Sequence, residues 1–119
     1  MNIILYGISN CDSVKKARQW LAAQAIDYQF IDFKKQAPNE NLIRQWLEQI
    51  ELAQVLNKRS STWRGLSIEE QAQAETTSGT IALMMQHPSL IKRPILQHPQ
   101  GITVGFDAQM YQQHFTAAI

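Results

Sequence analysis

The sequence predicts an α/β fold in which strand-forming segments near both ends of the chain enclose a helical middle. Three observations lead to this prediction: a continuous apolar run near the start, apolar residues at helical spacing through the middle, and two short strand-like runs late in the chain. The chain has 119 residues, of which 45% are hydrophobic and 18% are charged, as in an ordinary globular domain with its own core. We therefore expect a single domain over residues 1–119.

The first elements form a strand–helix–strand unit. Residues 2–6 (NIILY) are a continuous apolar run, which is typical of a strand covered on both faces. The period then becomes helical, with Val14, Ala17 and Leu21 on one face. Residues 27–33 (DYQFIDF) alternate and predict a second strand. Such a sequence of elements predicts a parallel βαβ unit.

The middle of the chain is predicted to be helical. After a Pro-Asn start, residues 38–50 place five apolar side chains on one stripe: Leu42, Ile43, Trp46, Leu47 and Ile50. Residues 67–70 (SIEE) match a capping box, and residues 79–88 predict a short buried helix that Pro88 ends. The helical insertion is therefore expected over about 38–90.

The last elements are a hairpin and a helix. Residues 94–106 predict two short strands joined around Pro99 and Gly101. Asp107 can cap a final helix whose inward side chains are Met110, Tyr111 and Phe115. The order β-α-β, helices, β-β-α predicts a thioredoxin-like fold, with the insertion between the N-terminal βαβ and the C-terminal ββα units.

Composition and charge argue against several classes of protein. A formal net charge of +1 gives no general attraction to nucleic acid or to an anionic membrane. The apolar runs are far shorter than a membrane span, and the first residues lack a signal peptide's basic start and cleavage site. One cysteine, with His87, His98 and His114 lacking the spacing of a ligand pair, makes a metal site unexpected. We expect a cytoplasmic protein with no metal, nucleic-acid or membrane partner.

Cys11 lies where the first predicted strand gives way to the first helix. Unpaired N–H groups and the positive end of the helix macrodipole favour thiolate over thiol at such a position. Lys15, about one turn later, and the neighbouring Lys16 would favour it further, whereas Asp12 would oppose it. A lone cysteine is also compatible with a small, inert core residue. The residues alone leave both interpretations open, and the predicted fold favours the reactive thiol, because thioredoxin-like proteins carry their reactive sulfur at this turn.

The sequence offers Cys11 no second thiol. Val14 occupies the position where a C-x-x-C redox motif has its second cysteine. If Cys11 forms a mixed disulfide, the resolving thiol must come from glutathione or from a cysteine of another protein.

Three short motifs together resemble a known family. They are Cys11 with Lys15 in NCDSVKKA, Arg59 in LNKRSSTWR, and Arg93-Pro94 in LIKRPIL. Over essentially the whole chain, the sequence resembles the arsenate reductase/Spx (ArsC/Spx) family, and most of all its YffB-like branch of small glutathione-dependent thiol reductases. The resemblance implies a thioredoxin-like fold and thiol chemistry at Cys11.

The resemblance also implies roles for individual residues. In arsenate reductases of this type a cysteine attacks arsenate, arginines from the insertion and from the segment before a cis-proline hold the oxyanion, and glutathione with glutaredoxin completes the reduction. Cys11, Arg59 and Arg93 match these positions, and Pro94 matches the cis-proline. Without the resemblance, the two arginines would be typical of a solvated charged surface.

The chain departs from the arsenate reductase pattern at two points. Lys15 stands where those enzymes usually carry an arginine, which keeps the charge but loses the bidentate fork. A further arginine expected after the hairpin has no counterpart in residues 102–109. The missing arginine weakens arsenate as the substrate, and Val14 argues against the C-x-x-C switch that many Spx-type regulators carry.

We interpret the chain as a cytoplasmic thiol oxidoreductase whose co-substrate is glutathione, with glutaredoxin as a further candidate partner and a small oxyanion or a thiol or disulfide as substrate. Cys11 would be the nucleophile, and Lys15, Arg59 and Arg93 would lower its pKa and hold the anion. The alternatives are arsenate reductase and, from another class, an Spx-like regulator that binds RNA polymerase. The complete expected site is Asn10, Cys11, Lys15, Arg59, Arg93 and Pro94.

Overall fold

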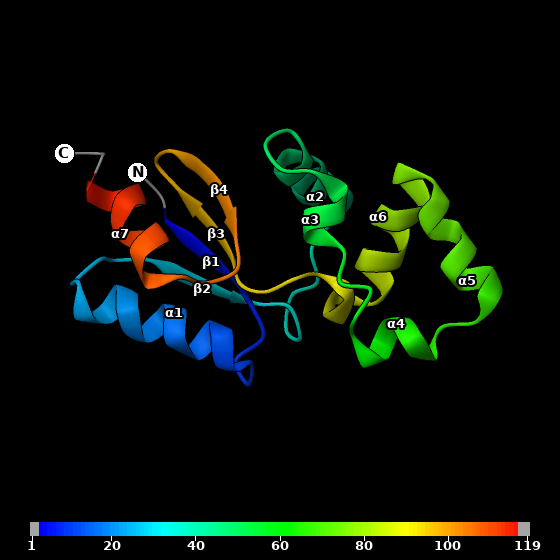
Figure 1. The fold of residues 1–119 in the computed structure, drawn as a ribbon, viewed down its shortest axis with the longest axis horizontal. Helices are drawn as coiled ribbons and strands as arrows, with labels where there is room; N and C mark the ends of the chain where they lie inside the picture. Colours follow the sequence, from blue (N-terminus) through cyan, green and yellow to red (C-terminus); the bar gives the residue numbers. More distant parts are fainter. Residues whose placement is uncertain (1–2, 117–119) are drawn as a thin grey trace. The chain divides into compact units, whose positions relative to one another are not determined.

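The computed structural model describes residues 3–116, and the chain divides into two compact units (Figure 1). The first unit combines the two ends of the chain, residues 1–36 and 93–119. The second unit is residues 37–92 and contains the helical insertion that the sequence predicts over 38–90.

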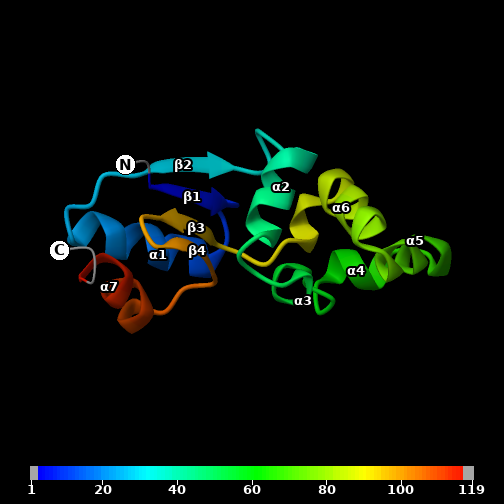
Figure 2. The same ribbon diagram turned by 90° about the horizontal axis from the view of Figure 1, so that it is seen from above.

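The first unit contains a four-stranded sheet of order β2-β1-β3-β4 (Figures 1 and 2). Its strands are β1 (Ile4–Gly7), β2 (Gln29–Asp32), β3 (Ile95–His98) and β4 (Gly101–Val104). β1 pairs parallel with β2 and antiparallel with β3, and β3 pairs antiparallel with β4. In this register Leu5 of β1 lies opposite both Phe30 and Leu96. The sheet confirms the predicted βαβ and ββα units and the thioredoxin-like layout.

Two helices cover one face of this sheet. They are α1 (Asp12–Ala23) and α7 (Ala108–Thr116), and both contribute to a fully buried cluster with β1 and β3: Leu5, Val14, Ala17, Leu21, Leu96 and Tyr111. As predicted, Asp107 caps α7, because its carboxylate accepts the N–H groups of Gln109 at 2.9 Å and Met110 at 3.3 Å.

The second unit consists of short helices. They are α2 (Glu40–Leu47), α3 (Leu52–Val55), α4 (Ser61–Gly65), α5 (Ile68–Ala72) and α6 (Thr77–Gln86), with 3₁₀ turns η1 (Gln73–Glu75) and η2 (Pro88–Leu90). The capping box predicted at Ser67 and Glu70 is present at the start of α5. α2 ends at Leu47, before the predicted residue 50, and Glu51 and Gln54 form a second capping box that starts α3. Across the described residues, the helices are too short or too polar to cross a membrane.

Candidate functional site

A tight junction between β1 and α1 positions Cys11. The chain leaves β1 at Gly7, and a Cβ added there would lie only 2.6 Å from Cγ2 of Val14 in the first turn of α1. The missing side chain therefore lets the start of the helix pack directly against the end of the strand. Cys11 is the N-cap residue, with extended backbone, and its N–H donates to the carbonyl of Ile8 at 3.1 Å. The strand-to-helix position predicted for the thiol is confirmed.

The surroundings of the partly buried Cys11 favour its thiolate. Burial raises the pKa of the thiol, but hydrogen bonds from the backbone N–H of Val14, from the Arg93 side chain and from the backbone N–H of Ser13 lower it, and the charge of Arg93 lowers it further. The net result is a pKa below the ordinary value of a cysteine. The helix N-terminus thus acts on the sulfur as predicted, through two N–H groups of its first turn.

Arg93 reaches this site from the far end of the chain. It directly precedes β3, which pairs with β1, and the Arg93–Pro94 peptide bond is cis, as the family resemblance implies. Pro94 is buried, and its carbonyl accepts the N–H of Gly105 at 2.8 Å. The pairing of β1 with β3 therefore brings together a thiol and a guanidinium that are far apart in the sequence.

Lys15 and Asn10 lie near Cys11 in the chain, but both are exposed. Lys15 is not among the groups that shift the Cys11 pKa in the described part of the chain, and its backbone N–H donates to the carbonyl of Cys11 at 2.9 Å. The cation that lowers the thiol pKa is Arg93, and the expectation that Lys15 contributes finds no support here. Contacts of Lys15 and Asn10 with a substrate remain predictions.

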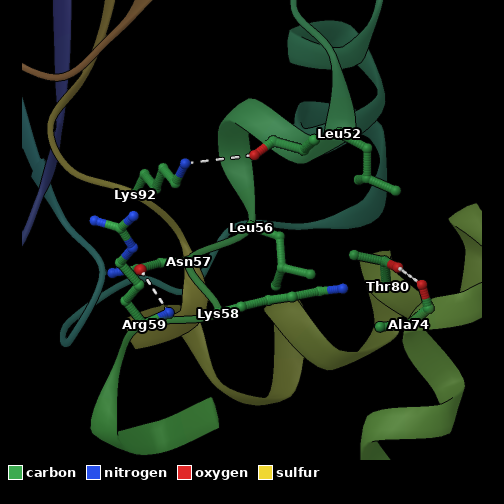
Figure 3. A pocket seen from close by; sticks show the side chains of 9 residues that line it. Leu52, Leu56, Asn57, Lys58, Arg59, Ala74, Thr80 and Lys92 are labelled. Atoms are coloured by element: carbon green, nitrogen blue, oxygen red, sulfur yellow. Dashed lines mark hydrogen bonds between the residues drawn. The ribbon is translucent and has the colours of Figure 1, made fainter.

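Arg59 belongs to the second unit, where it follows α3. It is exposed, and its backbone N–H donates to Oδ1 of Asn57 at 3.1 Å in the turn before α4. Arg59 also lines a pocket of about 750 Å³ within this unit (Figure 3). Its predicted role in holding an anion for Cys11 remains a prediction.

Two histidines in the first unit, His98 and His114, lack the spacing of a ligand pair in the sequence, but the structure brings them together. The rings of His98 and His114 stack with centroids 4.1 Å apart, and the hydroxyl of Thr103 bridges them, 2.7 Å from Nε2 of His98 and 2.9 Å from Nε2 of His114. Burial and the neighbouring His114 lower the pKa of His98 to about 4, and burial also lowers that of His114. The sequence did contain a signal, since His98 lies two residues after the buried Leu96 and so on the same face of β3.

Fold and site together define a class of protein. The sheet order, the cysteine at the N-cap of the first helix and the cis-proline that precedes β3 are those of a thioredoxin-like thiol protein with one cysteine. Within that class, this chain belongs to the ArsC family, whose model matches residues 6–114.

Individual relatives agree with this assignment. An uncharacterized protein of Haemophilus influenzae is 35% identical over 95% of this chain and 98% of its own length. The solved structure of the YFFB protein is 34% identical, with a TM-score of 0.88 and coverage of 95% of this chain and 98% of that one. The arsenate reductase (ArsC) related protein of Brucella melitensis is 35% identical, with a TM-score of 0.72 and coverage of 97% and 95%. The global transcriptional regulator Spx of Streptococcus pyogenes serotype M6 is 28% identical over 88% of this chain and 78% of its own length.

Proposed function

We propose that this protein is a glutathione-dependent thiol oxidoreductase with Cys11 as its nucleophile. The observation that carries the proposal is the surroundings of the sulfur, where two helix N–H groups and Arg93 lower the thiol pKa. A thiolate at neutral pH is the reactive form of cysteine in disulfide exchange. Relatives at 34–35% identity are named YFFB protein and arsenate reductase related protein, which supports thiol chemistry of this kind.

The proposed reaction is two successive thiol–disulfide exchanges. The Cys11 thiolate attacks one sulfur of a disulfide that contains glutathione, forms a mixed disulfide with the glutathione, and releases the other sulfur as a thiolate. A second glutathione loses its proton and attacks the mixed disulfide. This step frees the Cys11 thiolate and releases oxidised glutathione, while the thiolate released in the first step takes up the proton. One reduced glutathione is therefore consumed for each disulfide that is reduced.

The other site residues would serve binding. Arg93 would orient a carboxylate of glutathione or another anionic group as well as the thiolate, since a guanidinium can donate to two acceptors at once. Arg59, Lys15 and Asn10 would complete the anion site, and Pro94 would shape it, as the family resemblance implies. The glutathione pool that the reaction needs is a cytoplasmic one, and we place the protein there.

Mass spectrometry after incubation with oxidised glutathione tests this proposal. The wild-type protein should gain one glutathione, reduced glutathione should remove it, and Cys11→Ser should gain none. A wild-type protein that stays unmodified over the pH range in which free glutathione exchanges would contradict the proposed function.

Arsenate reduction is the alternative activity. A thiolate beside Arg93 is suited to attack an oxyanion, and several structural neighbours are named arsenate reductases. Adding arsenate with reduced glutathione distinguishes the two activities. Arsenite formation that depends on Cys11 would favour arsenate reduction, whereas disulfide turnover without arsenite formation would favour the thiol reductase.

A regulator that binds RNA polymerase is the alternative from another class. The observation in its favour is the similarity to Spx regulators of up to 28% identity. Pull-down with RNA polymerase, together with the glutathione assay, separates the two classes. Binding to the polymerase by both the wild type and Cys11→Ser, without glutathione turnover, would favour the regulator.

A further inference from the structure

The second unit contains a pocket of about 750 Å³ whose lining shares Arg59, but none of its other residues, with the anion site proposed for Cys11. Its lining residues come from α3 and the turn directly after it, from η1, from α6, and from the segment that follows η2 (Figure 3). Four separate segments of the chain thus line one concave surface within a single compact unit.

Three cations line this pocket: Lys58, Arg59 and Lys92. No carboxylate is among its lining residues, and within the described chain none of the three cations forms an ion pair with an aspartate or glutamate. Nζ of Lys92 makes a long hydrogen bond of 3.4 Å to the carbonyl of Ala53, and Nζ of Lys58 lies 5.4 Å from the ring centroid of Trp63. Like charges around one concavity repel one another, so an anion bound there is stabilised by all three.

The rest of the lining is mostly apolar. Leu52, Leu56, Ala53 and Ala74 contribute aliphatic surface. Thr80 adds little polarity, because its hydroxyl already donates within the protein. Its acceptors are the carbonyls of Thr76 at 2.8 Å and Ala74 at 3.2 Å. Figure 3 shows Leu56 among the charged side chains, with Lys58 extending toward Thr80. Such a surface suits a ligand that has an aliphatic part as well as a charge.

We propose that this pocket binds a small organic anion, a carboxylate or phosphate group joined to an aliphatic chain. Lys58 and Lys92 donate to the anionic group, and Arg59 adds a third positive charge to the same pocket. Leu52 and Leu56 contact the aliphatic part of the ligand. The proposal goes beyond the thiol oxidoreductase function and does not rest on it, because none of its steps involves Cys11.

Amide NMR titrations of the full-length wild type and of Cys11→Ser, at low salt, test the proposal. The titrants are hexanoate, hexyl phosphate, acetate, inorganic phosphate and 1-hexanol. We expect hexanoate or hexyl phosphate to shift the amides of the lining residues saturably, and the stronger of the two identifies the anionic group. Acetate, inorganic phosphate and hexanol should bind at least about tenfold more weakly, because each lacks either the charge or the aliphatic contact.

Matched variants identify the residues that bind the ligand. Lys58→Gln and Lys92→Gln should each weaken binding by roughly three- to tenfold, the range expected for a partly solvated charge-assisted contact. Arg64 is an exposed cation of the same unit that does not line the pocket, so Arg64→Gln should leave ligand binding unchanged. Cys11→Ser should bind as the wild type does even if the proposed thiol reaction fails. The proposal would be overturned if hexanol or acetate bound as tightly as hexanoate. It would also be overturned if both lysine variants bound the ligand as the wild type does, or if Cys11→Ser lost binding.

Discussion

At the scale of single residues, the site depends on a thiol and a guanidinium supplied by opposite ends of the chain. Cys11 sits at a helix start that supplies N–H donors, and Arg93 adds both a hydrogen bond and a positive charge. Lys15, which is much closer in sequence, does not contribute to the lowered pKa. The electrostatics of the sulfur are therefore set by the pairing of strands as much as by the helix that follows.

The pKa of Cys11 should rise when Arg93 is replaced. In the wild type, alkylation by iodoacetamide measured against pH should give a midpoint below the ordinary cysteine value. Arg93→Gln removes a hydrogen bond and a cation from the thiolate and should move the midpoint upward. Lys15→Gln is the matched control and should move it less. Equal shifts in the two variants would contradict the assignment of Arg93 as the cation that acts on the sulfur.

Turnover with glutathione should depend on Arg93 and Arg59 more than on other basic residues. A charge-assisted hydrogen bond contributes roughly 1.5–3 kcal/mol, so Arg93→Ala or Arg59→Ala should lower kcat/KM by about tenfold or more. Arginine to lysine at either position should restore part of the loss, because lysine keeps the charge but lacks the planar fork. Arg64→Ala is the control for a merely basic surface and should have little effect. Unchanged glutathione kinetics in both site variants at low salt would remove the anion site from the proposal.

At the scale of elements, close packing at the junction between β1 and α1 brings the thiol to the N–H groups of the helix start. Gly7 and Val14 are both buried, and the first turn of α1 packs directly against the end of β1. A side chain at position 7 would have to displace the β-branched Val14, which has little rotamer freedom in a helix.

Gly7→Ala should therefore destabilise the protein, by about 1–3 kcal/mol in urea unfolding, the usual range for overpacking of a core. Gly65→Ala is the matched control, because a Cβ added at Gly65 meets no atom within 4 Å, and it should be neutral or slightly stabilising. In Gly7→Ala combined with Val14→Ala, the loss should be smaller than the sum of the two single losses. Additive losses would show that the contact with Val14 is not what destabilises Gly7→Ala.

At the scale of the whole molecule, the stacked pair of His98 and His114 links stability to pH. His98 on β3 and His114 on α7 share Thr103 of β4, so the pair joins the hairpin to the final helix. His98 has a pKa of about 4 in the folded protein, and the residue is only 7% exposed. In the unfolded chain an ordinary histidine has a pKa of about 6.5.

Stability should fall as the pH falls from about 6.5 toward 4, because the unfolded chain then takes up a proton that the folded chain does not. Between pH 7.5 and 5 the loss from His98 should be about 1–2 kcal/mol in the free energy of unfolding. His98→Gln should reduce this slope, although it costs some stability at neutral pH. Urea unfolding at a series of pH values measures both effects, and an unchanged slope in the variant would show that other groups dominate the pH dependence.

The sequence by itself determined the features that depend on neighbouring residues. Apolar periodicity located the helix after Cys11 and the late hairpin, and local capping residues located the starts of α5 and α7 at Ser67 and Asp107. These signals are readable because a helix or a turn forms between residues that are close in the chain. The end of α2 has no such capping signal in the sequence, and the helix ends at Leu47, before the predicted residue 50.

The tertiary structure decided which of the expected cations acts on the sulfur. The family resemblance implies a role for Arg93, but its neighbours in the sequence do not by themselves indicate a contact with Cys11; that contact exists because β3 pairs with β1 and starts at the residue after Pro94. The His98–His114 stack has the same origin, since it needs a strand and a helix that pack through one core cluster. Contacts of this kind depend on the pairing of distant segments, and the free energy that selects one pairing comes from the burial of the whole core rather than from any short stretch of sequence.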